Sequence, residues 1–210
     1  MEITWFLFDL GNTVIKLAYE RVMDRICSSS STTRDELLEH FEAPGSYRDM
    51  ERGTATFNDF FEAMRERAGY RGSSQEFHAL WSDFFDGPIP GIELVLDEVR
   101  KHYRVAFLSN SNEVHAEVIP RTFGGLFRKD DRFIFSYRFQ CAKPDPELYR
   151  RALEVVGASP QQIVFIDDLL ENVHAARALG MHAIQFEDSA MLMQTLKADG
   201  LLPDARPSTR

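Results

Sequence analysis

The chain has little of several features that mark specialised protein classes. Its only cysteines are Cys27 and Cys141, and no cysteine–histidine cluster with the spacing of a zinc site accompanies them. Two thiols are too few for a disulfide scaffold, so we expect both to be reduced. No apolar run approaches the roughly 18 residues of a membrane-spanning helix. The first residues also lack a basic region followed by an apolar stretch, and we expect a cytoplasmic protein without a membrane partner.

Positive charge is also in short supply. The sequence has 24 basic against 33 acidic residues, a formal net charge of -9. A general nucleic-acid binder would show a basic stripe, so we expect no nucleic-acid partner. If the substrate carries a phosphate, local cations must overcome the acidic field. The 210 residues, 44% of them hydrophobic, suffice for one core domain with a substantial insertion.

Short apolar segments alternate with helical patterns in much of the chain. Buried strands are predicted at residues 3–8, 104–108, 133–136, 162–166 and 182–186, and helices at 93–102, 146–156 and 172–179. The helix at 146–156 has well-marked ends, because Asp145-Pro146 is a good N-terminal cap and Gly157 closes it. This alternation predicts an α/β fold with a doubly wound, Rossmann-like parallel sheet.

The segment 16–88 breaks the alternation. Helices are predicted at 34–41, 58–68 and 74–85, and no strand is expected. A helical insertion between the first two strands would lie over the carboxyl edge of the sheet as a cap. We therefore predict a catalytic core of residues 1–15 and 89–210 and a helical cap of residues 16–88. The sequence GPIPG at 87–91 is the expected hinge, and the tail 203–210 is expected to lack regular structure.

Residues that can carry chemistry stand where strands end or a helix begins. In chain order they are Asp9, Ser109 with Asn110, Lys143, and Asp167 with Asp168. Because parallel strands bring their carboxyl ends to one edge, where ligands bind in open α/β sheets, we expect these side chains to meet there.

Such a set suits the binding and transfer of a phosphoryl group. Asp9 and Asp168 would repel each other unless a hard cation lay between them, and two carboxylates with waters suit Mg²⁺. Lys143 adds a second cation, and a charge pair about 4 Å apart is worth roughly 4 kcal/mol at an effective dielectric of 20. Ser109 and Asn110 are candidate hydrogen-bond donors to phosphate oxygens. A carboxylate such as Asp9 can attack phosphorus and form an aspartyl-phosphate.

The order and separation of these motifs resemble the haloacid dehalogenase superfamily. The resemblance covers nearly the whole chain, with DLGNT at 9–13, Ser109, Lys143 and Asp167-Asp168 as the four motifs, and the insertion is similar to a small helical cap of the first type. The pieces DLGN at 9–12, FIDD at 165–168 and ERG at 51–53 look most like bacterial sugar-phosphate phosphatases, including glucose-1-phosphate phosphatases. The resemblance implies a Mg²⁺-dependent phosphatase acting on a small phosphorylated metabolite.

The resemblance also implies a role for each site residue. Asp9 is the expected nucleophile. The backbone carbonyl of Gly11 and the carboxylate of Asp168 are expected to join Asp9 in holding Mg²⁺. Ser109 and Lys143 are expected to bind the transferred phosphoryl group.

Supporting roles fall to neighbouring residues. Thr13 is expected to support the nucleophile loop, and Asn172 the metal site. Of the acidic pair, Asp168 aligns better with the metal ligand of the family, which leaves Asp167 as a supporting acid. Further candidate cations from the insertion are Lys16, Arg21 and Arg52.

Gly11 departs from the family pattern. Typical phosphatases of the superfamily have an aspartate there, which protonates the leaving oxygen and later activates water. Such acid–base help is worth about 10²–10⁴-fold, or roughly 3–5 kcal/mol of barrier. From Gly11 alone we predict a bias towards activated phosphates, such as anomeric sugar phosphates or acyl phosphates.

Two other functions fit parts of the pattern. A metal-independent 2-haloacid dehalogenase uses the same aspartate against carbon and also lacks the second acid, but it usually lacks the Asp167-Asp168 pair. A non-catalytic binding protein with this fold could have lost the second acid, although retention of Asp9, Ser109 and Lys143 argues against that.

Overall fold

Five parallel strands form the central sheet. The computed structural model describes residues 2–203. The expectation that the tail 203–210 lacks regular structure therefore lies, except for Pro203, outside the described residues. The strand order is β5-β4-β1-β6-β7, and every neighbouring pair is parallel. The strands are β1 (Trp5–Phe8), β4 (Arg104–Ser109), β5 (Arg132–Phe135), β6 (Ile163–Asp167) and β7 (His182–Gln185). All five predicted strands are confirmed close to their expected ends.

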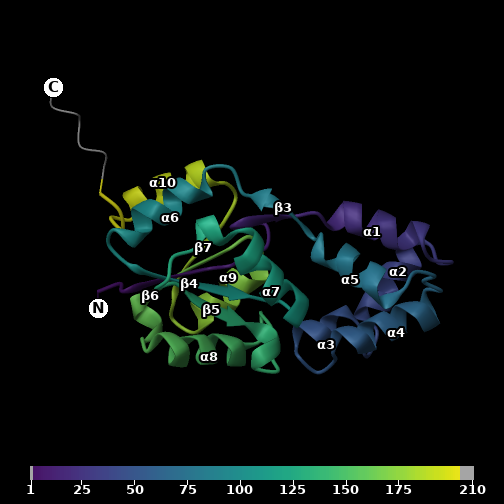
Figure 1. Ribbon diagram of the computed structural model, residues 1–210. Helices are drawn as coiled ribbons and strands as arrows, with labels where there is room; N and C mark the ends of the chain where they lie inside the picture. The colour runs from purple at the N-terminus through teal and green to yellow at the C-terminus, as the bar shows by residue number, and fades with distance from the viewer. Residues whose placement is uncertain (1, 204–210) are drawn as a thin grey trace.

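Alternate side chains of β1 point to opposite faces of the sheet, and both sets are apolar. Helices therefore pack on both faces of this sheet. Phe6 and Phe8 pack in one apolar cluster with α6 (Ile92–Arg100) and α10 (Ser189–Ala198). Trp5 and Leu7 pack in another with α8 (Pro146–Val156) and α9 (Leu170–Ala178). Figure 1 shows α6 and α10 above the sheet and α8 below it. The predicted doubly wound α/β class is confirmed.

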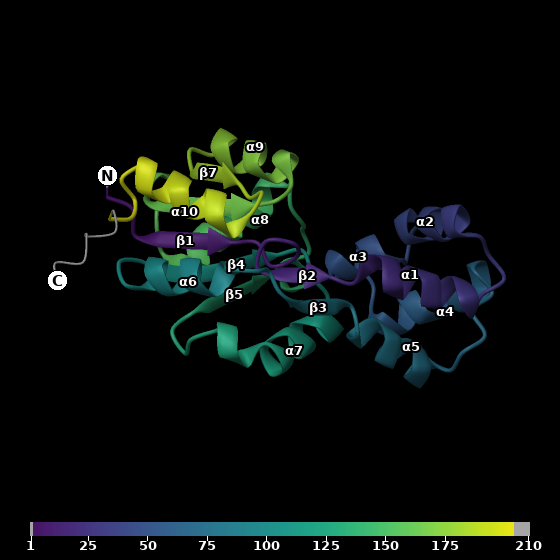
Figure 2. The same cartoon turned by 90° about the horizontal axis from the view of Figure 1, so that it is seen from above.

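The insertion forms a separate group of helices beyond one end of the sheet (Figures 1 and 2). Its members are α1 (Tyr19–Ser28), α2 (Arg34–Glu42), α3 (Tyr47–Glu51), α4 (Phe57–Arg67) and α5 (Ser74–Ser82). Reciprocal capping boxes begin α2, α4 and α5. Aromatic side chains fill the space between the helices, with the fully buried Trp81 against Phe41 and Phe60. The division into core and cap at 15/16 and 88/89 stays a prediction.

The expectation of no strand in residues 16–88 is wrong. The strands β2 (Ile15–Leu17) and β3 (Phe85–Pro88) pair antiparallel where the chain enters and leaves the insertion. Figure 2 shows them between the sheet and the insertion helices. Local patterns miss this pair because its members are short and far apart in sequence, and because glycine and proline in β3 argue against a strand.

The remaining elements complete the chain. The helix α8 has its predicted bounds, with Asp145 as cap and Gly157 left-handed at φ 65°. Four helices of the described residues were not among the predicted ones: α1 and α3 in the insertion, α7 (Glu113–Thr122), which contains Pro120, and α10. Short 3₁₀ turns are η1 (Gly124–Leu126), η2 (Ser136–Arg138) and η3 (Pro160–Gln162). Among the described residues, no helix has the length and apolarity needed to cross a membrane.

Candidate active site

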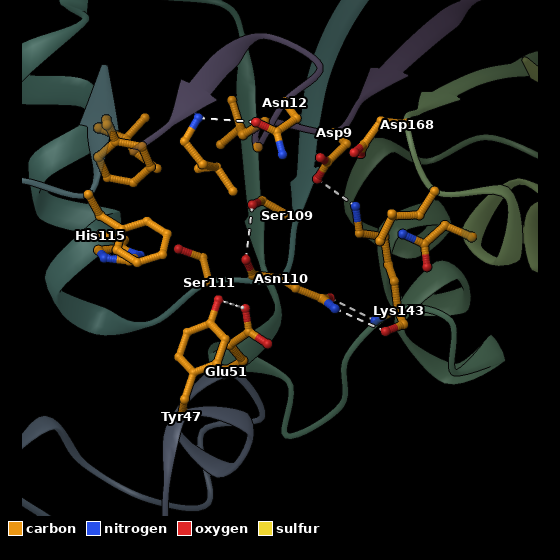
Figure 3. A pocket seen from close by; sticks show the side chains of 18 of the residues that line it. Asp9, Asn12, Tyr47, Glu51, Ser109, Asn110, Ser111, His115, Lys143 and Asp168 are labelled. Carbon is orange, nitrogen blue, oxygen red and sulfur yellow. Dashed lines mark hydrogen bonds and ion pairs between the residues drawn. The ribbon is translucent and has the colours of Figure 1, made fainter. Parts of the chain in front are cut away.

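The carboxyl ends of β1, β4 and β6 meet at the edge of the sheet that faces the insertion (Figure 2). Asp9 directly follows β1, Ser109 ends β4 and Asp167 ends β6. A cavity of about 280 Å³ lies there, and its walls come from both the sheet edge and the insertion. Its lining includes Asp9, Gly11, Ser109, Asn110, Lys143, Asp168 and Asn172 from the core, and Tyr47, Arg48 and Glu51 from the insertion (Figure 3).

Lys143 joins two of the predicted acids. Its Nζ lies 2.6 Å from Asp9 Oδ1 and 2.6 Å from Asp167 Oδ2. The exposed fractions of the three side chains are 2% for Lys143, 10% for Asp9 and 0% for Asp167. Water therefore screens these charges weakly, and the ammonium holds the nucleophile candidate in a fixed orientation.

Burial and neighbouring charge change the protonation of this cluster. Burial raises the pKa of Asp9 to about 7, with Lys143 opposing the rise and Asp167 adding to it. Burial alone would lower the pKa of Lys143, but the charges of Asp9 and Asp167 raise it above its ordinary value. Burial and the charge of Asp167 also raise the pKa of Asp168. The cluster therefore holds more negative charge than Lys143 alone can balance.

The two adjacent acids are used differently. Asp167 Oδ1 accepts hydrogen bonds from the Leu169 N–H and from Asn172 Nδ2, both at 2.9 Å, while its Oδ2 faces Lys143. Asp168 is only partly buried and lines the cavity. Figure 3 shows its carboxyl group beside that of Asp9. Both oxygens of Asp167 thus bind groups of the protein, whereas the carboxyl group of Asp168 is available to a ligand.

The donor set fits a hard divalent cation. Asp9, Asp167 and Asp168 each offer a carboxylate oxygen, and these oxygens lie within 4.8 Å of one another. The buried Oδ1 of Asn172 has no partner among the described residues, which leaves a neutral oxygen for a metal-bound water. Oxygen donors of this kind are those that Mg²⁺ prefers. A bound Mg²⁺ would also offset the burial and the carboxylate repulsion that together raise the pKa of Asp9 and Asp168.

The candidate phosphate-binding residues Ser109, Asn110 and Lys143 line the cavity with Asp9. Ser109 lines the cavity, and its hydroxyl donates to the Asn110 carbonyl at 3.2 Å. The Asn110 side chain pairs with the backbone of Lys143: its Nδ2 donates to the carbonyl at 2.9 Å and its Oδ1 accepts from the N–H at 2.7 Å. The amide of Asn110 therefore positions Lys143. Donation from Asn110 to phosphate stays a prediction.

The turn after Asp9 contains the two remaining predicted residues. Thr13 is fully buried, and its hydroxyl has no partner within residues 2–203. Gly11 lines the cavity, and a Cβ at this position would lie 3.2 Å from Leu17 Cδ1. Gly11 is not among the glycines with positive φ, so the backbone conformation does not require glycine here. Its main chemical consequence is the absence of a carboxyl group two residues after Asp9.

Comparison with known proteins identifies the family. Residues 3–180 match the haloacid dehalogenase-like hydrolases. The chain belongs to this family. The resemblance stated from the motifs is confirmed, and with it the expectation of a hydrolase.

Several relatives cover nearly the whole chain. It is 23% identical over 201 residues to a D-ribitol-5-phosphate phosphatase of Bacteroides thetaiotaomicron, covering 90% of this chain and 95% of that one. It is 33% identical over 209 residues to bifunctional epoxide hydrolase 2 of Mus musculus, of which it spans 37%.

Solved structures of the family also resemble this chain over most of its length. A HAD family enzyme of B. thetaiotaomicron in complex with magnesium and inorganic phosphate has a TM-score of 0.77 at 28% identity, covering 90% of this chain and 98% of that one. The L-2-haloacid dehalogenase PA0810, with a TM-score of 0.68 at 18% identity, covers 93% of this chain and 99% of that one and shares the fold.

The cavity of this hydrolase also contains residues that were not predicted. Tyr47, Arg48 and Glu51 of α3 and His115 of α7 line it. His115 is buried, its Nε2 lies 3.1 Å from the Trp81 carbonyl, and burial lowers its pKa to about 4. Of these residues, only Glu51 had a sequence signal, as the first residue of ERG at 51–53. The candidate cations Lys16, Arg21 and Arg52 are not among the described lining residues, and Arg21 pairs with Asp83 and Asp86.

Proposed function

We propose that this hydrolase is a Mg²⁺-dependent phosphatase that acts on a small phosphorylated metabolite through an aspartyl-phosphate on Asp9. The observation that carries the proposal is the buried bridge of Lys143 between Asp9 and Asp167, beside the partly buried carboxyl group of Asp168. In the first step an Asp9 oxygen attacks phosphorus, the bond to the substrate oxygen breaks, and that oxygen keeps the electron pair and takes up a proton, so that an alcohol leaves. In the second step water attacks the aspartyl-phosphate, and phosphate and free Asp9 result.

Each site residue has a task in this scheme. Lys143 and Ser109 would hold non-bridging phosphate oxygens, and preorganised charge of this kind is a major source of rate enhancement. Asp9, Asp168 and the Gly11 carbonyl would hold Mg²⁺, which neutralises phosphate charge as transfer proceeds. Thr13, Asp167 and Asn172 would support these groups from behind.

The size and polarity of the cavity support a sugar phosphate or polyol phosphate as substrate. Its volume of about 280 Å³ fits a small metabolite, and its lining includes a hydroxyl, a carboxyl and a guanidinium group from α3 that could bind the hydroxyl groups of such a substrate. The relative that acts on D-ribitol-5-phosphate points to the same class. We further propose that residues 16–88 act as the cap and residues 1–15 and 89–210 as the catalytic core.

A 2-haloacid dehalogenase is the main alternative, because family members with that activity share the fold. The acidic cluster of Asp9, Asp167 and Asp168 favours the phosphatase, since attack on carbon needs no cation site.

A substrate screen separates these functions. We expect the purified protein to release phosphate from sugar and polyol phosphates with Mg²⁺, and to lose this activity in excess EDTA. Asp9→Asn should remain folded and inactive. Halide release from a 2-haloacid that persists in EDTA, with no phosphate release from any ester, would establish the dehalogenase instead.

A further inference from the structure

Gly11 leaves the proposed phosphatase without a carboxyl group two residues after its nucleophile, where typical phosphatases of the superfamily have their acid. An alkoxide is a poor leaving group in water, and a positioned proton donor is worth about 10²–10⁴-fold in rate. The protein therefore needs either an activated substrate or a donor from elsewhere in the cavity.

The geometry of attack says where such a donor must stand. Phosphoryl transfer places the attacking and leaving oxygens roughly in line through phosphorus. Asp9 lies at the end of β1, in the wall that the sheet provides. The leaving oxygen therefore points away from Asp9 and towards the opposite wall, which α3 contributes with Tyr47, Arg48 and Glu51 (Figure 3).

Glu51 presents a carboxyl group in that wall. The residue is 8% exposed, and Tyr47 Oη donates to its Oε1 at 2.6 Å. Its Oε2 makes no hydrogen bond with any residue that the structure describes, and the side chain lines the cavity. One oxygen is thus fixed by the protein, and the other is available to a substrate.

Other ionisable groups in the cavity are less suited to this task. His115 is committed on both ring nitrogens, with Nε2 at 3.1 Å from the Trp81 carbonyl and Nδ1 at 3.2 Å from Asn112 Nδ2. Asp168 lies with the proposed metal ligands on the Asp9 side. Glu171 is exposed to solvent and belongs to α9 of the core, not to the wall that α3 contributes.

The backbone holds Glu51 in place over the sheet edge. Ser136 Oγ donates to the Glu51 carbonyl and accepts from the Ser111 N–H at 2.9 Å, which ties α3 to the core. Gly53 has a φ of 69°, and a Cβ there would lie 1.9 Å from the Tyr137 carbonyl oxygen. Only glycine allows this close approach. The ERG sequence at 51–53 therefore contains both the carboxyl group, on Glu51, and the glycine that lets α3 pack closely against the core, Gly53.

The surroundings of Glu51 keep its proton available at higher pH than an exposed glutamate would. Burial is the largest influence and raises its pKa. The Tyr47 hydrogen bond and the charges of Arg48 and Lys143 act in the opposite direction, and Glu42 adds to the rise. The net effect is a raised pKa, and Glu51 lines the same cavity as Lys143 of the proposed phosphate site.

We propose that Glu51 is the general acid and base that replaces the carboxyl missing at position 11. This inference rests on the proposed phosphatase function. As the Asp9–phosphorus bond forms and the ester bond breaks, the electron pair goes to the leaving oxygen, and Glu51 Oε2 gives it a proton. In the second step the Glu51 carboxylate takes a proton from the attacking water, phosphate leaves, and both side chains return to their starting state. The bias towards activated phosphates predicted from Gly11 alone is then unnecessary.

Leaving-group dependence tests this assignment. We compare kcat/KM of wild type and Glu51→Gln, with Mg²⁺, on D-ribitol-5-phosphate and on p-nitrophenyl phosphate, whose leaving group needs no proton. We expect Glu51→Gln to lose about 10²–10⁴-fold on the alcohol ester and less than about tenfold on the aryl ester. Glu51→Asp, which keeps a carboxyl, should recover part of the alcohol-ester activity. Glu62→Gln, an exposed carboxyl paired with Arg65 at 3.3 Å, is the matched control.

The outcomes are distinct. An equal loss on both esters, or no loss on either, overturns the role of Glu51 and leaves the phosphatase intact. A folded wild type that releases phosphate from neither ester overturns the proposed function and this inference with it. The wild-type kcat/KM for the alcohol ester should also fall as pH rises through the pKa of Glu51. Tyr47→Phe should move this fall to higher pH, since the Tyr47 hydrogen bond lowers the pKa of Glu51. If the fall in kcat/KM occurs at the same pH in wild type and Tyr47→Phe, the assignment is contradicted.

Discussion

Replacing Lys143 by methionine removes the only charge that balances the buried carboxyls of Asp9 and Asp167 among the described residues. Methionine keeps much of the apolar stem but leaves both acids without the ammonium that lies 2.6 Å from each. Removing one partner of a buried ion pair costs about 3–5 kcal/mol. We expect the free energy of unfolding in EDTA to fall by about that amount.

The loss should depend on pH in a specified direction. Burial already holds the pKa of Asp9 at about 7, and without Lys143 it rises further. A carboxyl whose pKa is higher in the folded state destabilises the fold increasingly as pH rises towards that folded value. The destabilisation of Lys143→Met should therefore be greater at about pH 8 than at about pH 6.

Urea unfolding followed by circular dichroism measures both effects, with the m-value as a check on two-state behaviour. Lys16→Met is the control, because that side chain is 64% exposed and lies 4.0 Å from Asp86; its effect should stay within about 0.5 kcal/mol. A loss below about 1 kcal/mol for Lys143→Met, or a loss that does not vary with pH, would refute the account of this cluster.

Three further predictions concern the glycine of α3, the buried histidine and the metal site. Gly53→Ala should cost about 1–3 kcal/mol through strain and contact with Tyr137 and lower kcat/KM, whereas Gly45→Ala, at φ 74° with open space around it, should cost less; thermal unfolding and kinetics measure both. The pKa of His115 is about 4 in the folded state against an ordinary 6.5, so its contribution to stability is present above pH 6.5 and lost as pH falls towards 4. The stability advantage of wild type over His115→Phe should therefore shrink by about 2.5 kcal/mol between about pH 7.5 and pH 4.5. Mg²⁺ at 100 times its Kd should stabilise wild type by about 2.7 kcal/mol, and the same concentration should stabilise Asp168→Asn less in a thermal-shift titration.

Each of these three predictions has a result that would contradict it. Equal losses for the two glycine variants would mean that contact with Tyr137 does not position α3. A stability difference that stays constant with pH would mean that His115 is solvated. Undiminished Mg²⁺ stabilisation of Asp168→Asn would place the cation elsewhere.

The positions of Asp9 and Asp167 were predictable because the topology of a parallel sheet determines where its strands end. Once residues 5–8 and 163–167 are recognised as buried parallel strands, Asp9 and Asp167 must emerge at the same edge. Local chemistry was also sufficient for α8, since Asp145 and Gly157 mark its ends directly. The family confirmed from residues 3–180 follows from the same motifs.

Features that depend on tertiary contact were not predictable. The pairing of β2 with β3 joins segments on either side of the insertion, and no local pattern shows it. The amide of Asn110 bonds to Lys143 only because two loops meet. Glu51 reaches the cavity only because α3 sits against η2, so its chemical value was hidden within a short motif.

Acid-quenched mass spectrometry during turnover tests the nucleophilic role of Asp9 most directly. The enzyme is mixed with Mg²⁺ and a sugar phosphate or polyol phosphate that it hydrolyses, quenched within one turnover, digested and mapped. We predict one phosphoryl group on the peptide that contains Asp9, and none in Asp9→Asn. Phosphate release by wild type with Asp9 unmodified throughout, or continued turnover by Asp9→Asn, would contradict the account.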